Sequence, residues 1–269
     1  MEQQCKQLAD GVELLVNRTD KFKTGLLSAT LTVPLRREDA TAGALIPEVL
    51  YRGSRSCPDM ERLSAATDAL YGASLGTGVR QRGESQCISF LCSVIDDRYA
   101  LDGSAVLEPA AGLMGEVLLD PAAENGVFRR DYVKGEGANL ADRIRARVND
   151  KRSWSIFRLV QEMCDGEAYA VDKLGDAEEA LSVSPEGLWA DYQALLGRAM
   201  DPELAADIDR IVLGHEYIMG IHDLVYHDYG PGRAMMSFHA EVPADGDFLE
   251  IHDVIDHIER ELKAKHHIE

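Results

Sequence analysis

The sequence predicts an α+β protein built from two modules. Its 269 residues, 45% of them hydrophobic, can fill the core of one large domain or of two ordinary ones. Strand patterns occur near the N-terminus and again near the C-terminus, and helical patterns occupy most of the chain between them. All eight histidines fall in the last 55 residues, and all five cysteines precede them. This change in composition divides the chain into modules 1–197 and 198–269.

The first module opens with strand signals. Residues 11–18 and 23–35 are rich in Val, Leu and Thr, and together they predict a hairpin. Residues 76–96 predict two further strands around the turn at residues 82–84. The side chains expected to point inward from the second of these strands are Ile88, Phe90 and Cys92.

Helices fill the remainder of the first module. Asp59 is expected to cap one helix, which Gly72 ends, and Ser184-Pro185 starts the last one. Apolar residues at helical spacing predict helices at residues 41–51, 59–71, 106–117, 128–148, 154–164 and 184–195.

The second module follows the order helix, strand, strand, helix. Apolar residues predict a helix over 204–212, then strands over 220–229 and 233–242. Gly230-Pro231-Gly232 predicts the hairpin turn between them, because no helix follows it as a phosphate loop would require. The residues expected to point inward are Met236, Phe238, Ala240 and Val242 on the second strand, and Ile251, Ile255, Ile258 and Leu262 on the last helix.

Charge and cysteine usage exclude several classes of partner. The chain has 28 basic and 47 acidic residues, and its net charge of -19 repels nucleic acids and anionic lipid surfaces. Its longest uncharged segment, residues 24–35, is too short to span a membrane, and the N-terminus lacks the apolar core of a signal peptide. An odd number of cysteines without a CxxC motif suits reduced thiols. We therefore expect a cytoplasmic protein.

Several short runs of the first module resemble the insulinase-like (M16) metallopeptidases: Gly43-Ala-Leu-Ile-Pro-Glu-Val-Leu-Tyr-Arg-Gly-Ser54, Leu63 through Ala73, and Arg82-Gly-Glu84. The later runs are similar to a non-catalytic subgroup that works beside an active M16-like protein: Asn125-Gly-Val-Phe128, Glu136, Glu162-Met-Cys164 and Leu174-Gly-Asp176. The resemblance covers residues 10–195. It implies a partial repeat of the M16-like α/β roll.

The same resemblance implies a pseudoenzyme. The family's inverted zinc motif HxxEH falls on residues 44–48, so Ala44 and Glu48 replace its histidines and Pro47 replaces its general base. If Glu136 is the family's helper glutamate, the distal ligand position holds Arg143, a cation that repels a metal. We therefore expect no catalytic residues, no cofactor-binding residues and no metal in this module. Glu48 and Glu136 are either a carboxylate pair or, as most acids are, solvated or ion-paired.

The second module offers donors for a metal. Imidazoles and carboxylates alternate along it, as in His222-Asp223, His227-Asp228 and His252-Asp253, and this mixture suits zinc and similar divalent ions. The alternative is that these are surface histidines of an acidic domain. The first 198 residues contain no histidine at all, so any metal is expected here.

Four phrases of the second module resemble the cytoplasmic C-terminal domain of cation diffusion facilitator transporters: Gly220 through Val225, His227 through Arg233, Phe238 through Pro243, and Glu250 through Asp256. The resemblance covers residues 195–269. It implies a dimerising, ferredoxin-like αββα(β) unit lacking its last strand, with zinc ligands at His222, His239 and His252. We expect His215, His227 and His257 on the surface, and His266 and His267 in a polar tail.

The sequence thus predicts a non-catalytic M16-like partner protein fused to a metal-binding and dimerisation module. Its expected partners are an active M16-like protein and a second copy bound through the C-terminal module, with no nucleic acid and no membrane span. The alternative is a regulatory metal-binding fragment related to the cation diffusion facilitators. A zinc metallopeptidase is a distant third.

Overall fold

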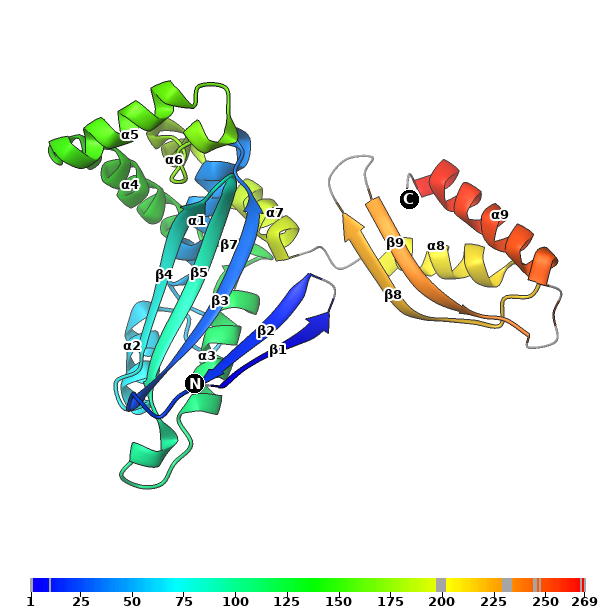
Figure 1. The fold of residues 1–269 in the computed structure, drawn as a ribbon, viewed down its shortest axis with the longest axis horizontal. Coiled ribbons are helices and arrows are strands. Elements are labelled where there is room, and N and C mark those ends of the chain that lie inside the picture. Colours follow the sequence, from blue (N-terminus) through cyan, green and yellow to red (C-terminus); the bar gives the residue numbers. More distant parts are fainter. Residues whose placement is uncertain are drawn as a thin grey trace. The chain divides into compact units, whose positions relative to one another are not determined.

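The computed structural model describes residues 2–9, 11–196, 202–228, 234–243, 246, 248–266 and 268 (Figure 1). The chain forms two compact units, Met1–Trp189 and Ala190–Glu269. The division falls inside α7 (Pro185–Leu196), a little before the predicted boundary.

The first unit is organised around an antiparallel sheet in the order β3-β5-β4. Its strands are β3 (Thr24–Pro34), β4 (Ser74–Arg82) and β5 (Ser85–Ile95). The central strand buries Ile88, Phe90 and Cys92, as the alternation of its sequence predicted. Strand β3 pairs with β5 along all 11 of its residues, and within the described part of the chain its other edge has no strand partner.

The predicted hairpin of residues 11–18 and 23–35 is wrong. Strand β2 (Val12–Arg18) pairs instead with β1 (Glu2–Ala9), a strand that the sequence pattern did not indicate, and β3 pairs with β5. The β1–β2 hairpin is a separate two-stranded sheet (Figure 1). The local composition correctly predicted β2 and β3, the strands that flank residues 19–23. It could not predict which strand each of them pairs with.

The predicted helices of the first unit are confirmed to within a few residues at their ends. They are α1 (Arg37–Leu50), α2 (Met60–Ala69), α3 (Leu107–Leu119), α4 (Arg130–Ala146), α5 (Lys151–Met163) and α7. Asp59 caps α2 by accepting a hydrogen bond from the Arg62 N–H, and Gly72 follows with a φ of 70°. Helices α1 and α3 both pack against β5.

Short elements escaped the sequence analysis because they are below the length of a periodic pattern. They are β6 (Ala123–Glu124), β7 (Val127–Phe128), α6 (Ala177–Ser182) and three-residue 3-10 turns η1 (Asp97–Tyr99), η2 (Arg147–Asn149) and η3 (Ala168–Ala170).

Two glycines let the helices approach closely around α1. A Cβ on Gly137 of α4 would lie 2.4 Å from the Ala180 carbonyl oxygen of α6. Gly175, with a φ of +73°, lies against the backbone of Thr41 on α1. The buried Gln86 amide donates to the carbonyl oxygens of Ala40 (2.9 Å) and Lys173 (2.7 Å). Helix α1 is thereby fixed between the sheet and α4.

The second unit has the predicted αββα order: α8 (Pro202–Leu213), β8 (Gly220–Asp228), β9 (Ala234–Glu241) and α9 (Phe248–His266). The core joins Ile208 and Val212 of α8 with Ile258 and Leu262 of α9, and Met236, Phe238 and Ala240 of β9 pack against it. Ile255, predicted to be buried, is 38% exposed. The predicted turn at residues 230–232 lies outside the described residues.

The architecture is therefore mixed helix and sheet, as predicted. Among the helices that the structure describes, no helix has the length and apolar character needed to cross a membrane.

Candidate functional site

The residues at the inverted zinc motif lie on α1, in the interior of the first unit. Ala44 is completely buried, and its methyl group offers no donor atom to a metal. Pro47 lies inside the helix and has neither an N–H nor an acid–base group in its side chain. Two of the three positions that the motif requires are therefore filled by apolar side chains.

Glu48, at the third position, is occupied by an ion pair. Its Oε1 atom lies 3.0 Å from Nη1 of Arg143 on α4, the residue at the distal ligand position. Ninety-five residues separate the two in sequence, and both side chains are partly exposed, Glu48 at 22% and Arg143 at 47%. The pair joins α1 to α4.

Glu136, at the helper position, is also ion-paired. Its carboxylate is 8% exposed and accepts hydrogen bonds from the Arg52 guanidinium and from the Asn139 amide, the latter at 3.0 Å. Both oxygens of a buried carboxylate are thus satisfied, which offsets the cost of burying its charge.

These residues do not fit a zinc ion. The carboxylates of Glu48 and Glu136 already hold guanidinium groups, and the resemblance places the cation of Arg143 at a ligand position. Of the two alternatives that the sequence left open, Glu48 and Glu136 are ion-paired helix acids. The sequence could not show these pairs, because each joins residues far apart in the chain.

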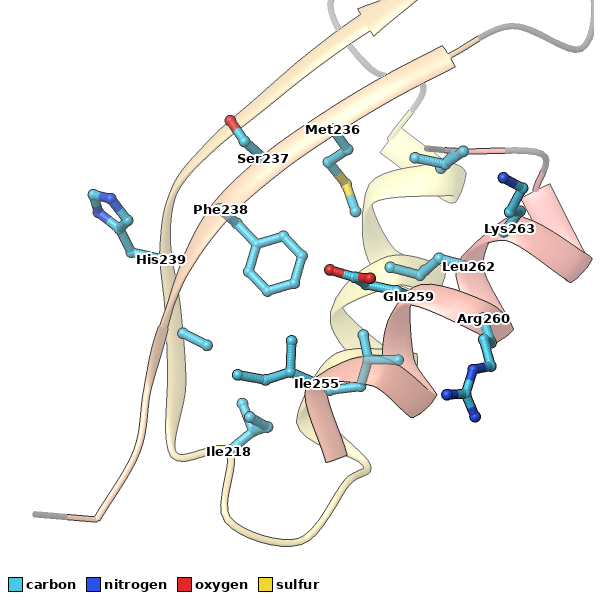
Figure 2. Close-up of a pocket in the computed structure, with 13 residues that line it drawn as sticks. Ile218, Met236, Ser237, Phe238, His239, Ile255, Glu259, Arg260, Leu262 and Lys263 are labelled. Carbon is cyan, nitrogen blue, oxygen red and sulfur yellow. The ribbon is translucent and has the colours of Figure 1, made fainter. Parts of the chain in front are cut away.

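In the second unit the structure brings two of the three predicted metal ligands into register. His222 on β8 pairs with His239 on β9 in the antiparallel ladder. His239 is exposed, and its side chain points away from α9 (Figure 2). Met236, Phe238 and Ala240 of β9 pack on the other side, against the core formed with α8 and α9.

His252 lies apart from that pair. It is on α9, 61% exposed, with Nδ1 4.0 Å from Oδ1 of Asp256. Helix α9 covers the sheet face opposite to the one from which His239 projects (Figure 2). No group of three or more His, Cys, Asp or Glu side chains forms a metal centre among the residues that the structure describes. The ligand set stays a prediction.

A groove that the sequence did not predict runs between β9 and α9 (Figure 2). Its floor is apolar and its rim carries Glu259, Arg260 and Lys263. The apolar lining residues are Ile218, Met236, Phe238, Ala240, Ile255, Ile258, Leu262 and Ile268. The partial exposure of Ile255 results from this opening, and a helical pattern alone cannot reveal it.

The predicted polar tail at His266 is wrong. His266 belongs to α9, its side chain is 19% exposed, and Nε2 lies 2.9 Å from Oδ2 of Asp207 on α8. Lys265 contacts the same carboxylate at 3.0 Å, and hydrogen bonds from Lys265 and His266 lower the pKa of Asp207. His266 therefore joins the two helices. His267 lies outside the described residues.

The first unit is similar to known proteins in sequence and in fold. The chain is 32% identical over 207 residues, 77% of its length and 49% of the relative's, to the probable inactive metalloprotease YmfF of Bacillus subtilis (strain 168). A conserved protein of Enterococcus faecalis V583 shares its fold with a TM-score of 0.67 and 27% identity, over 72% of this chain and 46% of that one. The first unit therefore resembles both proteins.

A peptidase M16 inactive domain from Pseudomonas fluorescens has the same fold, with a TM-score of 0.54 and 18% identity, over 71% of this chain and 43% of that one. The predicted resemblance to non-catalytic M16-like proteins is therefore confirmed. The chain spans about half the length of the relatives it matches.

Residues 200–269 match the family described as "Cation efflux protein, cytoplasmic domain". The match begins just before α8 and covers the whole of the αββα arrangement. The predicted resemblance of the second unit is confirmed as well.

Proposed function

We propose that this chain is a non-catalytic partner of a longer M16-like protein. The observation that carries the proposal is the ion pair of Glu48 with Arg143, because the resemblance places Glu48 in the zinc motif and Arg143 at the distal ligand position. This salt bridge links α1 to α4 without a metal. The chain can therefore keep the fold although it lacks the groups for zinc-dependent peptide hydrolysis.

Exposed apolar side chains of the first unit support a binding role. Helix α5 has no buried residue, and Ile156, Leu159 and Met163 form a row on one face, with Met163 74% exposed. The edge strand β3 carries Leu26 at 67% exposure. Exposing such apolar surface to water is unfavourable, and binding to a partner would bury it.

A longer M16-like protein is the partner that we favour, because the relatives are about twice the length of the segment matched here. In this proposal the first unit is one roll-like repeat, and the partner supplies the surface against which that repeat packs. The unpaired thiols suit a cytoplasmic complex, since all five cysteines lie in described residues and none is in a disulfide.

Two measurements test the proposal. The purified chain should cleave no peptide with or without Zn²⁺, and the variant Ala44→His/Glu48→His should not cleave either, because Pro47 is no base and Arg143 still opposes the metal. In the native host the chain should co-purify with a longer M16-like protein. Zinc-dependent cleavage by the parent that is absent in an Ala44→Asp control would contradict the first part, and recovery of a stable lone monomer would contradict the second.

The second candidate function is metal-responsive dimerisation through the C-terminal unit. We propose that this unit is ferredoxin-like and pairs with a second copy, on the strength of its likeness to the cation efflux cytoplasmic domain. His222 and His239, which pair in register, would provide two imidazole ligands for zinc, and His252 would have to come from the second copy. Neutral imidazoles suit Zn²⁺.

Light scattering with and without Zn²⁺ tests this candidate in the full chain. Zinc should raise the dimer fraction at pH 7.5. A His222→Ala/His239→Ala variant should remain monomeric with zinc. If that variant responds to zinc as the parent does, the assignment of these ligands is wrong.

A further inference from the structure

Helix α5 has one face held against the first unit and one face open to solvent. On the held face, the Cζ atom of Arg147 lies 4.6 Å from the centroid of the Phe157 ring, and the rings of Trp154 and Phe157 are 5.5 Å apart. Both aromatic side chains are half-buried, and the helix packs against η2 and η3. Helix α5 is therefore fixed on the unit, at one end of it (Figure 1).

The open face carries a row of side chains that changes in character along the helix. Ile156, Leu159 and Met163 follow one another at spacings of three and four residues, and each is more than half exposed. Arg152, four residues before Ile156, begins the same row and is exposed as well. The row thus has a cation at its start and apolar groups along the remainder.

Two adjacent cations, Lys151 and Arg152, occupy the first turn of α5. Both side chains are exposed, and neither makes an ion pair with another residue that the structure describes. Arg158 on the same helix, by contrast, is paired with Glu162. The charges of Lys151 and Arg152 are therefore available to an anionic group of another protein.

These two cations do not stabilise the helix that carries them. The positive end of the helix dipole lies at the first turn, so cations there are unfavourable. No acidic residue occupies this turn, which Asp150 caps by accepting a hydrogen bond from the Ser153 N–H at 3.1 Å. The chain as a whole has 47 acidic residues and only 28 basic ones. An anionic partner explains the two cations better than the stability of α5 does.

We propose that α5 binds the longer M16-like protein in an apolar groove that carries acidic side chains at one end, an inference that rests on the partner role proposed for this chain. The acidic end of the groove meets Lys151 and Arg152. The apolar part covers Ile156, Leu159 and Met163. Because the charges lie at one end of the row and the apolar contacts along the rest, they fix the direction in which α5 lies in the groove.

A local acidic patch suits this helix better than an anionic membrane does. A basic amphipathic helix can also bind anionic lipids. An extended anionic surface, however, would repel the rest of a chain whose net charge is -19. A patch at one end of a groove faces only the start of α5.

The test uses the full chain and the longer M16-like protein that co-purifies with it. Lys151→Glu/Arg152→Glu should raise the Kd of the complex about tenfold or more at about 50 mM NaCl, and the effect should shrink at about 500 mM NaCl, where salt screens the charges. The same variant should not lower the thermal midpoint, because acids favour the first turn of a helix. The matched control, Arg62→Glu/Lys134→Glu, makes the same change of charge at exposed positions of α2 and α4 and should leave the Kd within about twofold of the parent.

Carbodiimide cross-linking locates the contact directly, because it joins a lysine amine to a carboxylate that touches it. In the complex, Lys151 should link to an Asp or Glu of the longer protein, and the exposed Lys134 should not. Lys151→Arg keeps the charge, so it should retain the affinity and lose the link.

The outcomes separate this inference from the proposed function. If no longer M16-like protein co-purifies with the parent, both are overturned. If the parent and Lys151→Glu/Arg152→Glu bind that protein equally well and Lys151 forms no link, only the acidic groove is overturned and the partner role stands. Flotation with vesicles of phosphatidylcholine and phosphatidylserine tests the membrane alternative: vesicle binding by the parent that this variant loses, with the protein complex unaffected, would assign the face to lipid and overturn the proposal.

Discussion

Arg52 is the residue on which the buried carboxylate of Glu136 depends. Glu136 is 8% exposed, and Arg52→Ala leaves its carboxylate with the hydrogen bond that the Asn139 amide donates at 3.0 Å. Loss of one partner of a buried pair costs about 3–5 kcal/mol, and the partial exposure of Arg52 reduces this to about 1–3 kcal/mol. Urea unfolding should show this loss of stability.

The control is Arg55→Ala. Arg55 pairs with Asp120 at 2.8 Å, but the side chains are 80% and 40% exposed. Exposed pairs contribute about 0–1 kcal/mol, so this variant should unfold close to the parent. If Arg52→Ala and Arg55→Ala lower the free energy of unfolding by the same amount, Arg52 does not stabilise the buried carboxylate of Glu136.

Asp96 makes stability depend on pH at the end of β5. Hydrogen bonds from the side chain and backbone of Arg98 lower the pKa of Asp96 from 3.8 to about 2. The ionised form is therefore favoured by folding, and this contribution is present above pH 3.8 and is lost as the pH falls toward 2. Asp96→Asn should destabilise the chain at pH 5 and make little difference at pH 2, as measured by thermal unfolding.

Asp20→Asn is the matched control for this pH dependence. The Asp20 side chain is 93% exposed, and its carboxylate lies 3.4 Å from the Arg98 guanidinium. Because so exposed a pair contributes little to stability, Asp20→Asn should leave the thermal midpoint nearly unchanged at both values of pH. If the thermal midpoints of the parent and of Asp96→Asn differ by the same amount at pH 5 and at pH 2, the charge of the Asp96 carboxylate is not the cause of the difference.

Helix α5 offers the clearest prediction at the scale of single elements. Leu159→Glu/Met163→Glu replaces apolar side chains that are 57% and 74% exposed, so the unfolding free energy should change by no more than about 0.5 kcal/mol. Co-purification with the longer M16-like protein should fall strongly, because two charges would be buried at the interface.

The control is Arg158→Ala, which removes an exposed ion pair with Glu162 from the same helix. This variant should co-purify with the partner as the parent does. Undiminished recovery of the partner with Leu159→Glu/Met163→Glu would remove α5 from the interface.

The elements themselves show what a sequence can predict. Strands β4 and β5 and the helix capped by Asp59 were predicted because turn, cap and alternation are local signals. Strand β1 was not, since Glu2–Ala9 is polar and has no alternation, and the partner of β3 was wrong because pairing is decided by contacts distant in sequence. The ion pair of Glu48 with Arg143 was hidden for the same reason.

At the scale of the whole molecule, the division into two units predicts two unfolding transitions. Leu45 and Ile208 are completely buried, one in each unit. Leu45→Ala and Ile208→Ala should each cost about 2–5 kcal/mol and lower a different transition in scanning calorimetry. Zn²⁺ should raise only the transition that Ile208→Ala lowers, because every histidine lies in the second unit.

A single cooperative transition, lowered alike by both substitutions, would mean that the units unfold together. If Zn²⁺ raises the midpoint of the transition that Leu45→Ala lowers, the metal binds to the first unit. That result would contradict the conclusion that the side chains of α1 and α4 do not fit a zinc ion.

The Glu48–Arg143 pair also bears on the history open to this gene. Changing Glu48 to His leaves the Arg143 guanidinium without its counter-ion, and changing Arg143 to Glu replaces the attraction to Glu48 by repulsion between two carboxylates. Each first mutational step back toward a zinc centre therefore costs stability before any ligand set is complete, and Ala44 and Pro47 must change as well. A zinc centre at this site would therefore require several substitutions together, because no single one of them completes a ligand set.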